Sequence, residues 1–182
     1  MSTDTDEIIT PNAQTTGNID DPPLTNMEIY KNFKTQYERL KVALDHAFYL
    51  EAAFIEYAII EDRTASILAY EGNNRRKYEN MGLEKKLKKI KNCANQKTSD
   101  RPWIGTYFSD EHSNKLMDRI AAWKDNFRNP TVHTLMRIRT TTEGLHDYVM
   151  KGEALCKELD NLAKCYKSRV KNHAQDHVPE KP

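Results

Sequence analysis

The sequence has few cysteines and no long apolar run, and each absence excludes a class of protein. Three cysteines in 182 residues, at positions 93, 156 and 165, fit neither a disulfide framework nor a CxxC pair. Because disulfide frameworks belong to oxidising compartments, an intracellular, cytoplasmic protein is expected. No segment approaches the roughly 18 apolar residues of a membrane helix, and no basic segment followed by an apolar run opens the chain, so neither membrane insertion nor secretion is expected.

Several familiar catalytic motifs are also missing. The chain has no P-loop, no GxSxG and no HExxH string. His173 and His177, together with Asp176, have metal-ligand spacing but lie in a polar segment, so no metal site and no cofactor is predicted. Glycine and proline are sparse, at six and seven residues, which excludes a collagen-like or low-complexity chain. With 38% apolar residues, the length suits one domain with a single core.

Charge is distributed unevenly along the chain. The net charge is +1, but residues 1–30 hold six acids and no lysine or arginine. The other 152 residues therefore carry 28 bases against 21 acids, which makes the body of the protein about +7. A basic body is compatible with a polyanionic partner, although ordinary domains of either sign are common.

The first half of the chain divides into a leader and a long helical pattern. Residues 1–25 are polar and end in a proline pair, which predicts a disordered acidic leader. Thr25 and Glu28 then form a capping box at the start of a helical pattern over residues 26–71. This pattern fits one long helix or two helices with a break near Asp45, which could cap the second. The second part is apolar nearly all round and is predicted to be the central core helix.

The second half of the chain continues the helical pattern. A helix is predicted over residues 83–93 with its lysines on the outer face, followed by a loop over residues 96–109 whose aromatic residues fold back onto the core. Ser109 or Asp110 caps the next helix, and a last apolar stripe extends to residue 170 before a polar tail, residues 173–182. The fold predicted for residues 26–172 is an all-α, up-and-down bundle of four to five helices.

The segment Arg128-Asn129-Pro130-Thr131-Val132-His133 separates two of these helical patterns. Pro130 disfavours a continuous helix, so Asn129 is expected to cap a new helix with Pro130 at its first position. The free amides of a helix start, together with the Arg128 guanidinium, favour a bound phosphate. A neutral His133 beside them suits a general base. The alternative is a structural turn, in which Arg128 pairs with a surface acid and His133 packs at the helix junction.

The Arg-Asn-x-x-x-His string follows an amphipathic helix and a core helix with acids set in an apolar run, and in this it resembles the HEPN superfamily of helical bundles. The resemblance covers roughly residues 45–170, and Pro130 departs from the usual pattern. It implies a metal-independent endoribonuclease of a toxin–antitoxin or phage-defence system, acting as a homodimer and held in check by an antitoxin or sensor protein. Other members of this superfamily are non-catalytic binding or dimerisation modules, and that alternative stays open.

Carried over to this chain, the resemblance implies that His133 takes the proton from an RNA 2′-hydroxyl while Arg128 stabilises charge on phosphorus, leaving a 2′,3′-cyclic phosphate. Asn129 would orient the site. A supporting acid is expected from the core helix. Glu56 is the first candidate, and Glu61 or Asp62 is the next. Glu56 could instead pair with Arg63 or Arg119 or face solvent; burial without a partner would cost several kcal/mol, so a partner is expected.

The basic run over residues 75–97 is a second candidate functional feature. Such a run is most often a solvated helix face, but it can also follow an RNA backbone through salt-dependent phosphate contacts. The residues predicted to bind RNA are Lys85, Lys86, Lys88 and Lys89.

Overall fold

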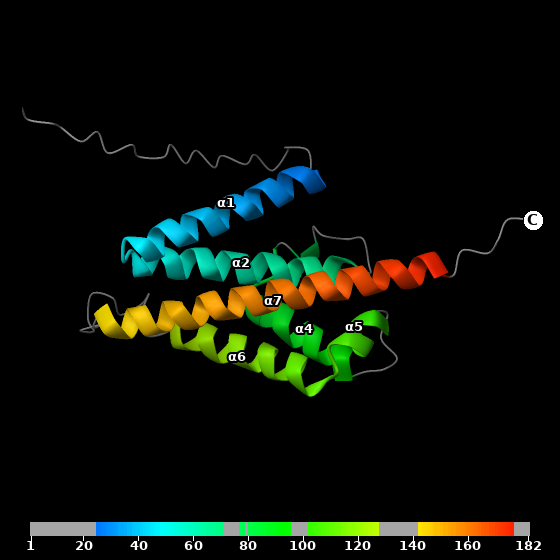
Figure 1. Cartoon of the computed structure of the whole chain (residues 1–182). Helices are drawn as coiled ribbons and strands as arrows, with labels where there is room; N and C mark the ends of the chain where they lie inside the picture. Colours follow the sequence, from blue (N-terminus) through cyan, green and yellow to red (C-terminus); the bar gives the residue numbers. More distant parts are fainter. Residues whose placement is uncertain (1–24, 71–76, 79, 96–101, 128–141, 177–182) are drawn as a thin grey trace, which may run out of the picture.

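The computed structural model describes residues 25–70, 77–78, 80–95, 102–127 and 142–176. These residues form an all-α helical bundle and include no strand. The labelled helices are α1 (Asn26–Asp45), α2 (Tyr49–Tyr70), α4 (Leu83–Asn95), α5 (Pro102–Tyr107), α6 (Glu111–Phe127) and α7 (Thr142–Asp176). Figure 1 shows α7 running along the bundle beside α2, with α1 on one side of the pair and α6 on the other. The predicted all-α bundle is therefore confirmed, while the described residues form six labelled helices instead of the four to five predicted.

Residues 26–70 contain two helices, α1 and α2, so the long helical pattern is broken. The capping box at the start of α1 is confirmed, because the Glu28 amide donates to Thr25 Oγ1 and the Thr25 amide donates to the Glu28 carboxylate. Asp45 is the last residue of α1, so the prediction that it caps the second helix is wrong. The chain turns through Ala47, which has φ 56°, and the Phe48 amide donates to the Ala43 carbonyl oxygen at 2.8 Å.

α2 is the central core helix, as its composition predicts. Its buried residues include Ala52, Ile59, Ile60 and Ile67, and they cover more than one face of the helix. α1, α4 and α7 all pack against it. A helix that is buried on several sides has no polar face to present to water, which explains why only a few acids interrupt its apolar run.

The segment before α6 differs in part from the sequence-based expectation. Residues 102–107 form the short helix α5 rather than part of a loop. Phe108 is buried and Trp103 and Tyr107 pack against the core, so the expected return of these aromatic residues is confirmed. Asp110 caps α6, because its carboxylate accepts a hydrogen bond from the Ser113 amide at 2.9 Å.

α7 is a helix of 35 residues that extends four residues into the predicted polar tail, to Asp176. It contacts both α2 and α6. Cys156 is buried and Cys165 is exposed, so the two cysteines lie on different sides of α7. Among the described helices, none is both long enough and apolar enough to cross a membrane.

Candidate functional site

The predicted catalytic residues Arg128, Asn129 and His133 lie outside the described residues. The segment that contains them begins directly after the last residue of α6, Phe127, and ends where α7 begins, at Thr142. The last turns of α6 and the first turns of α7 are therefore the described elements that flank the motif in the sequence.

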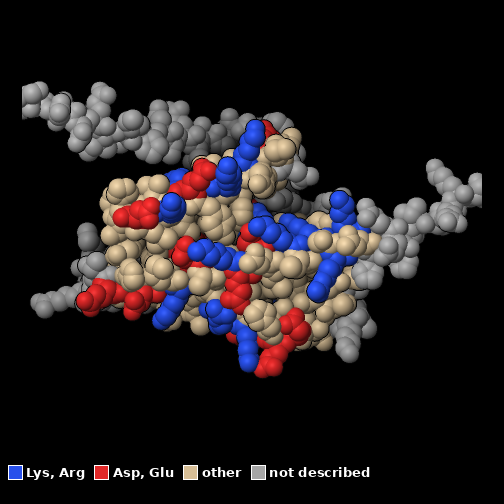
Figure 2. All heavy atoms as spheres, in the orientation of Figure 1, with Lys and Arg blue, Asp and Glu red and all other residues tan. Residues whose placement is uncertain are grey.

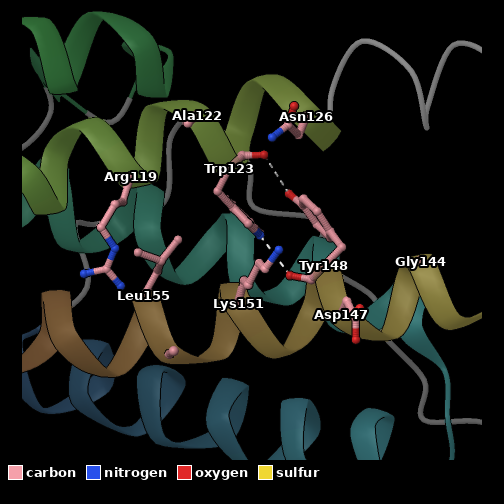
Figure 3. Close-up of a pocket in the computed structure, with 10 residues that line it drawn as sticks. Arg119, Ala122, Trp123, Asn126, Gly144, Asp147, Tyr148, Lys151 and Leu155 are labelled. Atoms are coloured by element: carbon pink, nitrogen blue, oxygen red, sulfur yellow. Dashed lines mark hydrogen bonds between the residues drawn. The ribbon is translucent and has the colours of Figure 1, made fainter.

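Trp123 and Tyr148 join these two helix ends. The indole Nε1 of Trp123 donates to the Tyr148 carbonyl oxygen at 3.2 Å, and the Tyr148 hydroxyl donates to the Trp123 carbonyl oxygen at 3.2 Å. Their rings are stacked with centroids 5.0 Å apart and planes 13° apart. Figure 3 shows the two reciprocal hydrogen bonds connecting α6 to α7. Two hydrogen bonds and a ring stack fix the relative position of the helices here.

Glu56 of α2 lies beneath this aromatic pair with no exposed surface. A β-carbon on Gly152 of α7 would lie 2.0 Å from Glu56 Oε2 and 2.9 Å from Trp123 Cζ2, which shows how closely the three residues approach. Neither carboxyl oxygen of Glu56 has a hydrogen-bond partner among the described residues. The expectation that a buried Glu56 has a partner is therefore met only by the Glu153 backbone amide, which acts on the carboxyl without completing a hydrogen bond of normal geometry.

Burial without a partner changes the protonation of Glu56. Desolvation raises the pKa of its carboxyl to about 9; the nearby Glu153 carboxylate adds to the rise, and the Glu153 backbone amide opposes it. Glu56 is therefore protonated and neutral near pH 7. Burial likewise raises the pKa of the Tyr148 hydroxyl and of the Cys156 thiol, and Glu56 contributes to both shifts. This end of the bundle contains several titratable groups held in their neutral forms.

The partners suggested for Glu56 are engaged elsewhere. Arg63 lies 3.6 Å from the centre of the Phe33 ring and forms ion pairs with Asp62 at 2.9 Å and Asp160 at 3.6 Å. Arg119 forms an ion pair with Glu158, in which its Nη1 donates to both carboxylate oxygens, at 3.0 and 2.8 Å. The alternative in which Glu56 faces solvent is also wrong, because its side chain is fully buried.

Glu61 and Asp62, the other two acids considered on α2, both form ion pairs. The Glu61 carboxylate lies 3.4 Å from the Lys86 ammonium, which also donates to the Glu61 carbonyl oxygen at 3.4 Å. Asp62 is held by Arg63. Of the three acids considered on α2, Glu56 is the one whose carboxyl oxygens lack a partner in the described residues.

The predicted RNA-binding lysines of α4 do not share one face. Lys86 is 1% exposed and paired with Glu61, so its expected place on the outer face is wrong; its alkyl chain packs inward while its ammonium reaches a carboxylate on α2. Lys85 and Lys88 are exposed and Lys89 is partly exposed, and RNA binding stays a prediction for these three. In Figure 2 basic and acidic side chains are mixed over the left and middle of the face, whereas basic side chains predominate at its right end, over the C-terminal part of α7.

A pocket of about 460 Å³ opens between α6 and α7 beside the Trp123–Tyr148 pair. Its lining residues are Arg119, Ala122, Trp123, Asn126, Gly144, Asp147, Tyr148, Lys151, Ala154 and Leu155. The volume lies within the range of small-molecule sites, and an apolar wall with a few polar groups at its edge is typical of them.

Sequence reasoning identified Glu56 but missed Trp123, Tyr148 and Gly152. An isolated glycine inside a long helical pattern usually has a packing reason, and Gly152 was a signal of this kind.

The described residues contain no group of three side chains that could hold a metal ion. No family model, no curated protein and no solved structure matches this chain.

Proposed function

We propose that this protein is a HEPN-like, metal-independent endoribonuclease whose site lies at the α6–α7 end of the bundle. His133 acts as the general base on an RNA 2′-hydroxyl, Arg128 stabilises the charge that develops on phosphorus, and Asn129 orients the two. The products are a 2′,3′-cyclic phosphate and a free 5′-hydroxyl. The protein acts as a homodimer, and an antitoxin or sensor protein restrains it.

The observation that carries the proposal is the buried carboxyl of Glu56. It lacks a hydrogen-bond partner of normal geometry among the described residues. It lies beneath the last turns of α6, and α6 ends directly before the Arg-Asn-x-x-x-His string in the sequence. A buried polar group without a partner is costly for stability, and such groups are concentrated at functional sites. Because Glu56 has no exposed surface, its role in the proposal is that of a positioning residue and not of a group that touches RNA.

The proposal is tested by cleavage of single-stranded RNA in EDTA. We expect the wild type to cleave and to leave cyclic phosphate ends, and His133→Ala and Arg128→Ala each to slow cleavage by about 100-fold or more, as is common when a general base or charge-stabilising group is removed. Cleavage at the wild-type rate by both variants would exclude the assigned roles. Loss of wild-type cleavage in EDTA would indicate a metal-dependent reaction instead.

Expression in bacteria provides an independent test. The wild type should arrest growth, while His133→Ala should not, at equal levels of folded protein. Growth unaffected by the wild type, together with loss of stability in the alanine variants, would favour the alternative of a non-catalytic helical module in which the motif is a structural turn.

A further inference from the structure

The pocket between α6 and α7 combines an apolar wall with polar groups placed at its edge. Trp123 and Leu155 are 5% and 3% exposed and form its floor, with the partly buried Tyr148 beside them. Ala122 and Ala154 are exposed alanines on either side, and their small side chains leave the space open. A flat, aromatic group fits such a space better than a fully hydrated ion does.

Two polar side chains lie next to the aromatic pair by helix geometry. Asn126 follows Trp123 by three residues, and Lys151 follows Tyr148 by three, so each lies on the same helix face as its ring. Both are exposed, and Figure 3 shows the Lys151 side chain directed from α7 toward the Trp123–Tyr148 pair. Among the described residues no acid lies within ion-pair distance of the Lys151 ammonium, although Asp147 stands one turn before it on α7, so an anion bound here would meet Lys151 first.

Of the remaining charged groups at the edge, Arg119 is compensated by an acid, whereas Asp147 has beside it only the His146 ring, which is charged only when protonated. Arg119 is held by Glu158, and Asp147 lies 3.4 Å from the His146 ring. Among the described residues that line it, the pocket therefore presents one cation without an ion pair, Lys151, beside an apolar wall and the Asn126 amide, which offers a donor and an acceptor together. The edge of a nucleobase carries both hydrogen-bond donors and acceptors, which an amide can pair with. The phosphate of the same nucleotide is an anion, which the cation can bind.

We propose that this pocket is a nucleotide subsite that binds one base of single-stranded RNA. The base lies against Tyr148 and the apolar wall, the Asn126 amide contacts the edge of the base, and Lys151 contacts the adjoining phosphate. This inference rests on the proposed ribonuclease function and names the group by which that site holds its substrate. It adds residues that bind RNA without taking part in the proton transfers.

The test measures binding separately from cleavage. The probe is an oligodeoxynucleotide of about eight residues, which lacks the attacking 2′-hydroxyl and so is not cleaved. Trp103→Phe in the full chain leaves Trp123 as the only tryptophan, and the probe should change its fluorescence. Ala154→Phe fills the pocket and Lys151→Ala removes the cation; each should weaken binding by about tenfold, the loss expected for one stacked base or one phosphate contact.

Matched controls exclude general effects of size and charge. Ala58→Phe adds the same ring at an exposed alanine of α2, and Lys31→Ala removes the same charge from an exposed position of α1. Both should bind the probe as the wild type does. If Ala154→Phe and Lys151→Ala bind like these controls, the subsite is wrong. It is also wrong if inorganic phosphate displaces the probe as well as a nucleoside monophosphate does, because the pocket would then recognise an anion alone.

The subsite and the nuclease proposal fail in different ways. Cleavage that depends on His133, combined with probe binding that is insensitive to Ala154→Phe and Lys151→Ala, overturns the subsite alone. Probe binding that is sensitive to both variants, in a protein that does not cleave RNA, supports the subsite and overturns the catalytic assignment.

Discussion

Replacing Glu56 by glutamine removes a buried titratable group close to Trp123 and Gly152 with little change in side-chain shape. The carboxyl has a pKa of about 9 in the folded protein against 4.5 for the exposed group, so the folded state keeps a proton that the unfolded state loses. The contribution of the protonated Glu56 carboxyl to the stability of the folded state is fully present below about pH 4.5 and is lost as the pH rises toward 9. Within this window the free energy of unfolding should fall by up to about 1.4 kcal/mol per pH unit.

Urea denaturation of the wild type and Glu56→Gln at several pH values between 5 and 9 measures this effect. The wild type should lose stability relative to Glu56→Gln as the pH rises, and the difference between the two curves isolates Glu56 from other titrating groups. Parallel curves would contradict an unpartnered carboxyl and would indicate that a cation compensates it.

At the scale of the helices, Gly152 determines how closely α7 approaches α2 and α6. A β-carbon there would overlap both Glu56 and the Trp123 ring, and a hydrogen bond to α7 holds that ring in place. Gly152→Ala gains about 1 kcal/mol of helix propensity but loses about 1–3 kcal/mol to overpacking. We expect a net loss of stability of about 1 kcal/mol, measured by denaturant unfolding.

A double-mutant cycle with Glu56→Ala tests this cause. Shortening Glu56 makes room for the new methyl group, so the two changes should be non-additive by about 0.5 kcal/mol or more. Additive losses would mean that the cost of Gly152→Ala arises elsewhere in the helix.

The helices themselves could largely be predicted from the sequence, because periodicity and caps are local signals. The capping box at Thr25 and the apolar run of α2 are examples. α5 was missed because six residues are too few to show a helical period. The inward path of Lys86 was missed because a repeat of lysines does not reveal which of them meets an acid of another helix, here Glu61.

The candidate site was only partly predictable for a related reason. An acid inside an apolar run marked Glu56 as unusual, and that signal is local. The pairing of Trp123 with Tyr148, and the contact of Gly152 with Glu56, join residues 25 and 96 positions apart in the sequence. Spacing along one helix contains no information about such contacts between helices, so only the folded arrangement reveals the pocket.

At the scale of the whole molecule, the uneven charge distribution bears on RNA binding. Residues 1–24 contain five acids and no base, while the full chain has a net charge of +1. Removing these residues leaves a chain of about +6, so the proposed RNA affinity should rise by a few fold at low salt. The difference should shrink at high salt, because screening weakens interactions between exposed charges.

A full-length variant with the five acids replaced by their amides, at positions 4, 6, 7, 20 and 21, separates charge from length. Both chains should bind the uncleavable probe more tightly than the wild type, and by similar factors, in anisotropy titrations across a salt series. Tighter binding by the truncated chain alone would mean that these residues obstruct the site by their bulk. Equal binding by all three chains would mean that the acidic residues do not influence the RNA-binding surface, and the basic body of the protein would then act independently of them.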